Sequence, residues 1–376
     1  MWYSKYRLIR LFRTASHLRP CRPSSCLYST SRQEPLQILF CGADDFSIFS
    51  LEAFHKLRQV DPALIASIHV LCKNDKATGR GSKTISSPPI KAKALSLDLP
   101  THQIDTFTGW TPPFSYNLII AVSFGLLIPP RILSGANYGG LNVHPSLLPD
   151  LRGPAPIHRA LLHNDTHTGV TLQTLHPQHF DRGDIVAQTP AIAIPKTATV
   201  ETLLPTLGHA GADLLTQSLK TQSFLPPYSS KSSSHSTHGL LRHAPRITSS
   251  DHKIDPEHDT ANKILTYSRV LGRLSCPDSL TIFLQNITPF KAASPIQITG
   301  LKDMTDELPS TLSLLKTTYS IRRHNDEWKL LLRTVDGRLL TPESINVPGR
   351  PTKTTSALLE ALIANAPRGV REGLEG

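Results

Sequence analysis

Short apolar runs that alternate with helical patterns are the feature that most constrains the fold of this chain. Five runs indicate buried strands: LQILFCG (36–42), LIASIHVL (64–71), NLIIAVS (117–123), GLNVH (140–144) and GVTLQTL (169–175). Helical periodicity lies between or after them, at 46–57, 90–97, 156–163 and 200–219. Because such alternation is typical of parallel sheets covered by helices on both faces, we predict an α/β domain with a doubly wound, mostly parallel sheet.

The first residues have a composition unlike the rest of the chain. Seven basic residues and no acidic residue occur before Glu34, and apolar residues interleave with the arginines at 6–14. A helix there would have one basic and one apolar face, which is typical of a mitochondrial transit peptide. We therefore interpret residues 1–33 as such a segment. The alternative is a basic arm that binds nucleic acid.

Composition also marks an internal boundary. Residues 223–238 read SFLPPYSSKSSSHSTH, which is polar and lacks periodic apolar positions. We predict an N-terminal domain at 34–222, a linker at 223–240 and a C-terminal domain at 241–376. No run reaches the ~18 to 20 apolar residues that a membrane-spanning helix requires, so we expect no membrane association.

The C-terminal domain has a different pattern from the N-terminal one. A helical pattern occurs at 259–270 and another at 355–364. Short apolar runs indicate strands at 280–284, 296–300, 311–321, 329–335 and 338–340. Short strands at this spacing favour a small β-barrel or an open β-sheet.

The net charge of +11 is unevenly distributed. Without the seven basic residues of the first segment it is +4, and residues 33–220 hold 14 basic and 14 acidic side chains. The remaining positive charge lies after residue 220, where 19 residues are basic and 15 are acidic. This excess hints at a polyanionic partner of the C-terminal half.

Candidate catalytic residues lie at the end of one predicted strand. Asn142 and His144 are two positions apart, so they share a face of the strand at the sheet edge where α/β proteins bind ligands. An amide beside an imidazole suits acyl transfer. Asp181, in the segment DRGD, could orient His144. Taken alone, a histidine near an asparagine is more often a surface or core residue.

The sequence context of these residues is more specific. Residues 116–188 include YNLIIAVSFGLLIPPRIL, GGLNVHPSLLPDLRGPAPIHRALLHNDTHTGVTLQTL and FDRGDIVAQ. This passage resembles the folate-dependent formyltransferases, and most closely the methionyl-tRNA formyltransferases. The resemblance implies a Rossmann-like domain followed by a small OB-like β-barrel, with Asn142, His144 and Asp181 as the catalytic trio. One departure is Asp44, which stands where that family usually has proline.

The same resemblance implies a folate pocket. Its residues come from three stretches: Phe124, Gly125 and Leu126; Ser146, Leu147, Leu148 and Pro149; and Gly183 and Asp184. For the leucines, plain packing is the alternative. The five cysteines show no paired CxxC spacing, so we expect no metal site.

A basic loop, KNDKATGRGSK at 73–83, resembles the loop with which tRNA formyltransferases enter the acceptor stem. The alternative is a solvated surface loop. The residues expected to contact tRNA are Lys76, Arg80 and Lys83 in this loop, Arg152, and Lys253, Lys263, Arg269 and Arg273 in the C-terminal domain.

The expected activity follows from the resemblance. It is transfer of the formyl group of 10-formyltetrahydrofolate to the α-amine of methionine on initiator tRNA, by a monomer in the mitochondrial matrix. Alternatives are a formyltransferase for a small amine, a formyl-folate hydrolase, or a catalytically silent RNA-binding protein that retains the fold. The basic loop and the C-terminal domain argue against a small acceptor. The catalytic trio argues against a silent protein.

Overall fold

The computed structural model describes residues 34–78, 84–228, 241–290, 295–309, 317–348 and 350–375. The predicted transit peptide and most of the predicted linker lie outside these residues. Two large hydrophobic cores form, one around a sheet in residues 36–224 and one around a second sheet in the C-terminal part.

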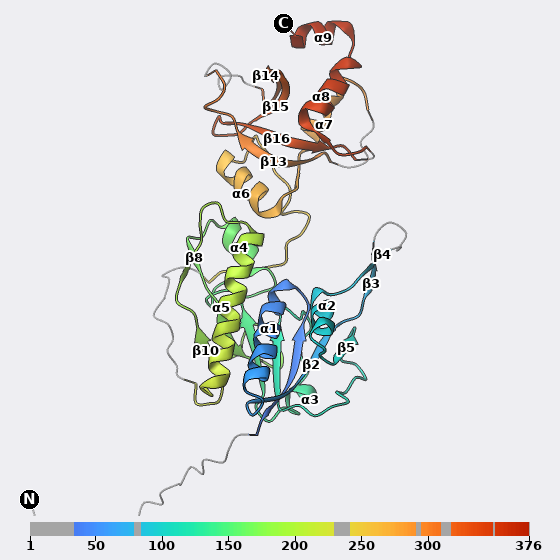
Figure 1. Ribbon diagram of the computed structural model, residues 1–376. Coiled ribbons are helices and arrows are strands. Elements are labelled where there is room, and N and C mark those ends of the chain that lie inside the picture. The colour runs from blue at the N-terminus through green and yellow to red at the C-terminus, as the bar shows by residue number, and fades with distance from the viewer. Residues whose placement is uncertain are drawn as a thin grey trace, which may run out of the picture. The chain divides into compact units, whose positions relative to one another are not determined.

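A seven-stranded sheet organises the N-terminal part (Figure 1). Its strands are β1 (Leu36–Gly42), β2 (Ile65–Lys73), β5 (Thr101–Ile104), β6 (Leu118–Val122), β7 (Gly140–His144), β9 (Thr171–Thr174) and β10 (Ile185–Gln188). The order is β10-β9-β7-β6-β1-β2-β5. Pairing is parallel from β7 to β5 and antiparallel at β9 and β10. The predicted mostly parallel sheet is confirmed.

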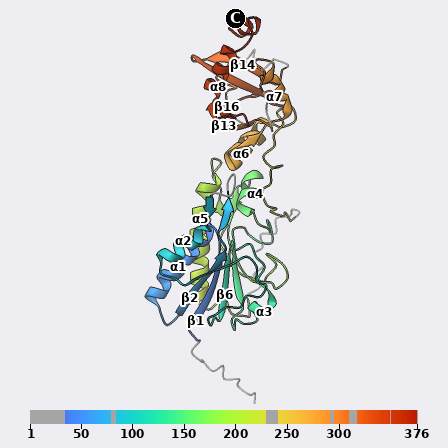
Figure 2. The same ribbon diagram turned by 90° about the vertical axis from the view of Figure 1, so that its right-hand side faces the viewer.

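Helices cover both faces of this sheet because its central strands are apolar throughout. In β1, Ile38 and Phe40 join the core under one face, whereas Leu39 and Cys41 join the core on the other. The first face is covered by α1 (Asp45–Val60), α2 (Pro89–Ser96) and α5 (Val200–Lys220), and the second by α3 (Pro130–Leu133) (Figures 1 and 2).

Two local features determine where α1 begins and how closely it packs on α5. Asp44 is the N-cap of α1, and its side chain accepts a hydrogen bond from the Ser47 amide at 3.2 Å, which satisfies a free N–H of the first turn. On α5, a Cβ at Gly208 would lie 2.4 Å from the Phe49 ring of α1. The two helices therefore pack closely only because this position lacks a side chain.

Smaller elements surround the sheet. An antiparallel hairpin of β3 (Lys76–Thr78) and β4 (Thr84–Ser86) follows β2, and every residue of both strands is exposed. Helix α4 (Pro156–Leu162) follows β7, and β8 (His167–Thr168) pairs with β11 (Ile192–Ala193). Strand β3 lies within the basic loop identified in the sequence at 73–83, and residues 79–83 of that loop lie outside the described residues.

The C-terminal part contains a second, antiparallel sheet. Its strands are β12 (Leu274–Ser275), β13 (Gln297–Asp303), β14 (Tyr319–His324), β15 (Glu327–Arg333), β16 (Leu339–Asn346) and β17 (Lys353–Thr354). The helices are α6 (Ala261–Leu271), α7 (Asp278–Gln285), α8 (Thr355–Ala364) and α9 (Arg368–Glu375). Helix α8 packs on β15 and β16. The predicted small β domain is confirmed as an antiparallel β-sheet domain.

One predicted strand is wrong. Residues 280–284 form part of α7 instead. In a strand, positions 280, 282 and 284 would share a face, but Leu280 and Leu284 are fully buried whereas Ile282 is 57% exposed. Burial at i and i+4 is the helical period, which a run of only five residues does not distinguish from alternation.

Candidate active site

The carboxyl end of β7 carries two of the predicted catalytic residues. Asn142 lies opposite Gln173 of β9, and His144 lies opposite Thr171. His144 is buried, with 5% of its surface exposed, and Asn142 is half-buried. On the other side, Asn142 pairs with Ala121 near the end of β6. The two side chains therefore lie near the middle of the sheet, at the carboxyl ends of its parallel strands.

Asp181 joins them from the loop between β9 and β10. Its Oδ1 lies 3.4 Å from Asn142 Nδ2 and 3.4 Å from His144 Nδ1. Its φ of 52° lies in the left-handed region, which costs an aspartate less than most residues. The structure thus brings the three predicted catalytic residues together around one carboxylate.

Two further groups hold that carboxylate. The Gly153 amide donates to Asp181 Oδ2 at 2.9 Å, and Gln173 Nε2 donates to Oδ1 at 3.3 Å. Gln173 is buried, and its Oε1 accepts from the Gly183 amide at 3.2 Å. The sequence interpretation missed Gln173. Its signal was a glutamine inside the apolar run GVTLQTL, because a buried amide must find hydrogen-bond partners.

The ring of His144 is held at both nitrogens. Nε2 lies 3.0 Å from the Leu151 carbonyl oxygen, and Nδ1 faces Asp181. Both partners are oxygen acceptors, so a doubly protonated imidazole can donate to both at once. The two contacts therefore fix the orientation of the His144 ring.

The sequence is similar to those of known proteins. The family model described as formyl transferase matches residues 37–219. The mitochondrial methionyl-tRNA formyltransferase of Saccharomyces cerevisiae is 36% identical over 282 residues, and the match covers 64% of this chain and 69% of that protein. The chain belongs to the methionyl-tRNA formyltransferase family.

Other members of the family match at similar levels. The mitochondrial methionyl-tRNA formyltransferase of Homo sapiens is 32% identical over 257 residues, which cover 66% of this chain and 60% of the human protein. The chain thus matches less than two thirds of the human protein's length. The methionyl-tRNA formyltransferase of Pelotomaculum thermopropionicum is 31% identical over 272 residues, covering 70% of this chain and 81% of that protein. The resemblance found at residues 116–188 is confirmed at the level of the family.

The SLLP turn, where the family resemblance implies folate contacts, follows His144 directly. Ser146 is buried and its hydroxyl donates to the Asp150 carbonyl at 2.8 Å. The Leu148 amide donates to Thr171 Oγ1 at 3.0 Å, and Leu148 is also buried. Leu147 is half-buried and Pro149 is exposed. Ser146 and Leu148 thus shape the turn, whereas Leu147 and Pro149 have surface available to a ligand.

The second expected folate stretch follows β6, beside the catalytic edge. Phe124 is buried, and its ring packs against Phe107 with centroids 6.0 Å apart. Gly125 is exposed with φ of 71°, and its carbonyl accepts from Lys73 Nζ at 3.4 Å. Leu126 is half-buried. The exposed backbone of Gly125 lies near the site, while Phe124 belongs to the core.

The third stretch supports the Asp181 loop. A Cβ at Gly183 would lie 1.7 Å from the Thr174 carbonyl oxygen, so no larger residue fits there without moving backbone. Asp184 is exposed, and its amide donates to Thr174 Oγ1 at 2.8 Å. Gly183 therefore lets the loop approach β9 closely and bring Asp181 to His144.

The residues expected to contact tRNA are spread over several elements. Lys76 is exposed on β3, and Arg80 and Lys83 lie outside the described residues. Arg152 is half-buried, and its carbonyl accepts from the Ala244 amide at 2.7 Å. Of Lys76 and Arg152, which the structure describes, Lys76 has the more accessible charge.

The C-terminal candidates differ in availability. Lys253 and Arg273 are exposed, and Arg273 Nη1 donates to Gln297 at 3.3 Å. Lys263 pairs with Asp259, which raises the pKa of Lys263. Arg269 is half-buried and donates through Nε to the Ala198 carbonyl at 3.1 Å. The Arg269 guanidinium is therefore already engaged in a hydrogen bond within the protein.

Within the residues that the structure describes, no group of three or more histidine, cysteine, aspartate or glutamate side chains could hold a metal ion. In the same part of the chain, no helix combines the length and apolarity needed to cross a bilayer.

Proposed function

We propose that this protein transfers a formyl group from 10-formyltetrahydrofolate to the α-amine of methionine esterified to initiator tRNA. The observation that carries the proposal is the convergence of Asn142, His144 and Asp181 at one edge of the sheet, in a chain of the methionyl-tRNA formyltransferase family. An amide donor, an imidazole and a carboxylate within one hydrogen-bonded group are the residue types that direct acyl transfer requires.

The residues present fit a formyl folate. Leu147 and Leu126 offer half-buried apolar surface after the ends of the paired strands β7 and β6, and Gly125 is exposed. Apolar surface combined with a few polar groups is typical of small-molecule sites. When bound there, the folate supplies an activated formyl carbon attached to nitrogen.

The chemistry of the proposal balances without a covalent enzyme intermediate. The methionyl nitrogen forms a bond to the formyl carbon, and the bond from that carbon to the folate nitrogen breaks. The proton lost by the amine equals the proton gained by the departing folate nitrogen. Asn142 would donate to the formyl oxygen while it gains negative charge, and a protonated His144, whose ring nitrogens face Leu151 and Asp181, would stabilise that negative charge electrostatically.

Asp181 has a supporting role in this scheme. Its carboxylate faces His144 Nδ1, and the Gly153 amide and Gln173 fix its position. It would hold the imidazole in place and stabilise positive charge on it. It could also accept the amine proton through a water molecule.

The basic surface supports a tRNA acceptor. Every residue of strands β3 and β4 is exposed, and the charged side chain of Lys76 lies in solvent. Lys253 and Arg273 are exposed in the C-terminal part. Basic side chains at the surface attract phosphates without reading sequence.

The named relatives also support a location. The proteins from Saccharomyces cerevisiae and Homo sapiens are both described as mitochondrial, and residues 1–33 have the composition of a transit peptide. We propose that this protein acts in the mitochondrial matrix.

One experiment separates the proposal from its alternatives. The purified protein is incubated with 10-formyltetrahydrofolate and Met-tRNA, and the methionine released from the tRNA is analysed by mass spectrometry. We expect N-formylmethionine. Release of free formate would favour a hydrolase, formylation of a small amine but not of Met-tRNA would favour the other transferases, and tRNA binding without product would favour a silent RNA-binding protein.

A further inference from the structure

The first described residues after the linker lie along loop 150–155, which follows the SLLP turn. The Leu151 amide donates to the Arg242 carbonyl at 2.9 Å, the Ala244 amide donates to the Arg152 carbonyl at 2.7 Å, and the Ala155 amide donates to the Ala244 carbonyl at 3.2 Å. These bonds run through loop 150–155, which leads from the SLLP turn into α4. A segment about 90 residues away in sequence is thus paired with this loop.

The loop supplies two contacts to the catalytic trio. The Leu151 carbonyl oxygen lies 3.0 Å from His144 Nε2, and the Gly153 amide donates to Asp181 at 2.9 Å. Leu151 has a φ of 58°, in the left-handed region that a leucine rarely adopts. Because such a conformation persists only when its surroundings impose it, the position of the Leu151 carbonyl depends on what holds the loop.

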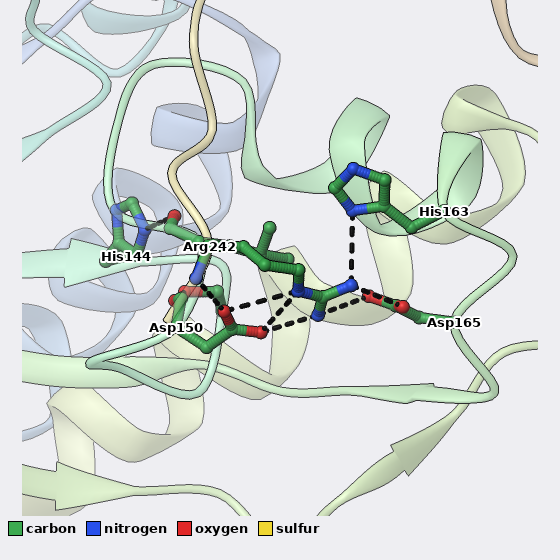
Figure 3. Close-up of polar contacts among 7 residues, drawn as sticks. His144, Asp150, His163, Asp165 and Arg242 are labelled. Atoms are coloured by element: carbon green, nitrogen blue, oxygen red, sulfur yellow. Dashed lines mark hydrogen bonds and ion pairs between the residues drawn. The ribbon is translucent and has the colours of Figure 1, made fainter. Parts of the chain in front are cut away.

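Arg242 provides the strongest such hold. Its backbone amide donates to Asp150 Oδ1 at 2.9 Å, and its Nη2 donates to Asp150 Oδ2 at 2.5 Å. The same guanidinium donates to both oxygens of Asp165, at 2.7 and 2.9 Å. Figure 3 shows the Arg242 side chain between the two carboxylates, with His163 beside it. The Arg242 guanidinium thus links the loop to Asp165, three positions after the end of α4.

Charge effects agree with this geometry. Burial acts to raise the pKa of Asp150, but the hydrogen bonds from Arg242 and its charge lower it overall. The hydrogen bonds to Asp165 and Asp150 raise the pKa of Arg242. Burial and the neighbouring guanidinium lower the pKa of His163, so a neutral His163 can accept from Arg242 Nη1 at 3.1 Å. The directions of these shifts for Asp150, Arg242 and His163 therefore agree with the protonation states that their hydrogen bonds require.

We propose that Arg242 is a positioning residue for formyl transfer. It acts through Asp150 and loop 150–155 to hold the Leu151 carbonyl against His144 and the Gly153 amide against Asp181. This proposal rests on the proposed function of the same site. Because a small misplacement of a catalytic group can cost up to about 100-fold in rate, loss of the Arg242 contacts slows the chemical step on the order of 10-fold.

A matched arginine serves as control. Arg159 of α4 also binds the post-linker segment, through Asp251 at 2.6 Å and the carbonyls of Pro245 and Arg246 at 3.1 and 3.2 Å. Its side chain makes no described contact with loop 150–155. Removal of either arginine breaks a bidentate ion pair. Of the two side chains, however, only that of Arg242 contacts the loop that includes Leu151.

The test measures kcat, KM for Met-tRNA and Tm of full-length wild type, Arg242→Ala, Arg242→Lys and Arg159→Ala. We expect kcat to fall about 10-fold in Arg242→Ala with KM within about 2-fold, and about 3-fold in Arg242→Lys, because lysine cannot span two carboxylates as a planar fork. Arg159→Ala lowers Tm at least as much as Arg242→Ala yet keeps kcat within about 2-fold of wild type. Equal loss of kcat in Arg242→Ala and Arg159→Ala would overturn the proposal.

A double-mutant cycle distinguishes positioning from general damage. If Arg242 acts through His144, Arg242→Ala causes no further loss of rate in a His144→Ala background. A full additional 10-fold loss there would also overturn the proposal. If wild type forms no formyl-methionine, the proposed function fails instead. In that case NMR of the His144 ring still tests whether Arg242 positions His144. Arg242→Ala is expected to shift the His144 nitrogen resonances, and Arg159→Ala is not.

Discussion

The catalytic edge at β7 and the β3–β4 hairpin are both proposed to act on the same tRNA, yet they are built in opposite ways. At the edge, His144 is 5% exposed and Asp181 receives hydrogen bonds from three residues, Asn142, Gly153 and Gln173. In the hairpin, all six strand residues are exposed, including Ile85 at 72%. The proposed chemistry thus falls on atoms fixed by several hydrogen-bond partners. The proposed tRNA binding falls on an exposed side chain, that of Lys76.

This difference has an energetic basis. A group that stabilises developing charge works best where its orientation is fixed before the reaction begins. A lysine that attracts phosphates acts over several ångströms and needs no fixed geometry. Substitutions at the edge should therefore reduce rate strongly, whereas those in the hairpin should reduce affinity mildly.

The largest effect is expected for His144→Ala. Loss of the imidazole removes the group that would stabilise negative charge on the formyl oxygen, so the single-turnover rate should fall about 100- to 1,000-fold. Affinity for tRNA, measured by filter binding, should stay within about 2-fold of wild type. His258→Ala, an exposed histidine paired with Asp255 in the C-terminal part, serves as control. A tRNA affinity that falls in parallel with the rate would contradict the separation between the two regions.

The next effect concerns the loop that presents Asp181. In Gly183→Ala the new methyl group would lie 1.7 Å from the Thr174 carbonyl oxygen, so the loop must move away from β9 and displace the carboxylate. We expect a 10- to 100-fold loss of rate together with a lower Tm. Gly369→Ala, where the added methyl group meets no atom within 4 Å, should change neither. Wild-type kinetics in Gly183→Ala would show that the Asp181 position tolerates movement.

A smaller effect is expected in the hairpin. Lys76→Ala removes one exposed charge, so tRNA affinity should fall a few-fold and the slope of log K against log salt should decrease by about 1. The rate at saturating tRNA should not change. Lys56→Ala removes an exposed lysine of α1 and provides the comparison. Identical salt slopes for wild type and Lys76→Ala would remove the hairpin from the tRNA contact surface.

The smallest effect concerns two carboxylates, one from each region. Arg242 lowers the pKa of Asp150 in the catalytic loop despite its burial, and the hydrogen bond from Lys91 lowers the pKa of exposed Asp75 at the base of the hairpin. A folded-state pKa below the unfolded value, about 3.9, contributes stability above that value. This stability is lost as the pH falls through the lowered folded-state pKa.

Urea unfolding at pH 6 and at low pH tests this difference. At pH 6, Asp150→Asn should lower the free energy of unfolding by roughly 1 kcal/mol, and the deficit should shrink as the pH falls below about 4. Asp75→Asn should have a smaller effect at either pH because solvent screens its ion pair. A deficit in Asp150→Asn that persists unchanged at low pH would mean that the ion pair is not its cause.

Much of this architecture is predictable because local patterns determine it. The run LQILFCG is apolar on both faces, and β1 is indeed buried on both. The two-residue spacing of Asn142 and His144 predicts their common face without any tertiary information. Five residues at 280–284 are too few to separate the two periods, so the strand prediction there failed.

Other features depend on distant contacts that no local pattern reports. Asp150 and Arg242 are 92 positions apart, and nothing in the spacing of either motif indicates their ion pair. The Leu151 carbonyl and Gly153 amide are backbone groups, so residue type says nothing of their role at the site. Gln173 was detectable only as a polar residue inside an apolar strand. The fold was thus more accessible to sequence reasoning than the support of the site.

The most direct test follows a labelled formyl group. 10-Formyltetrahydrofolate carrying ¹⁴C in its formyl group is mixed with Met-tRNA and either wild type or Asn142→Ala, and label on tRNA-bound methionine is compared with label lost from the folate. Wild type should transfer the label in a 1:1 ratio, and Asn142→Ala should transfer it at least about 100-fold more slowly. Wild-type transfer rates in Asn142→Ala, or label that leaves the folate without reaching methionine, would contradict formyl transfer at the β7 edge.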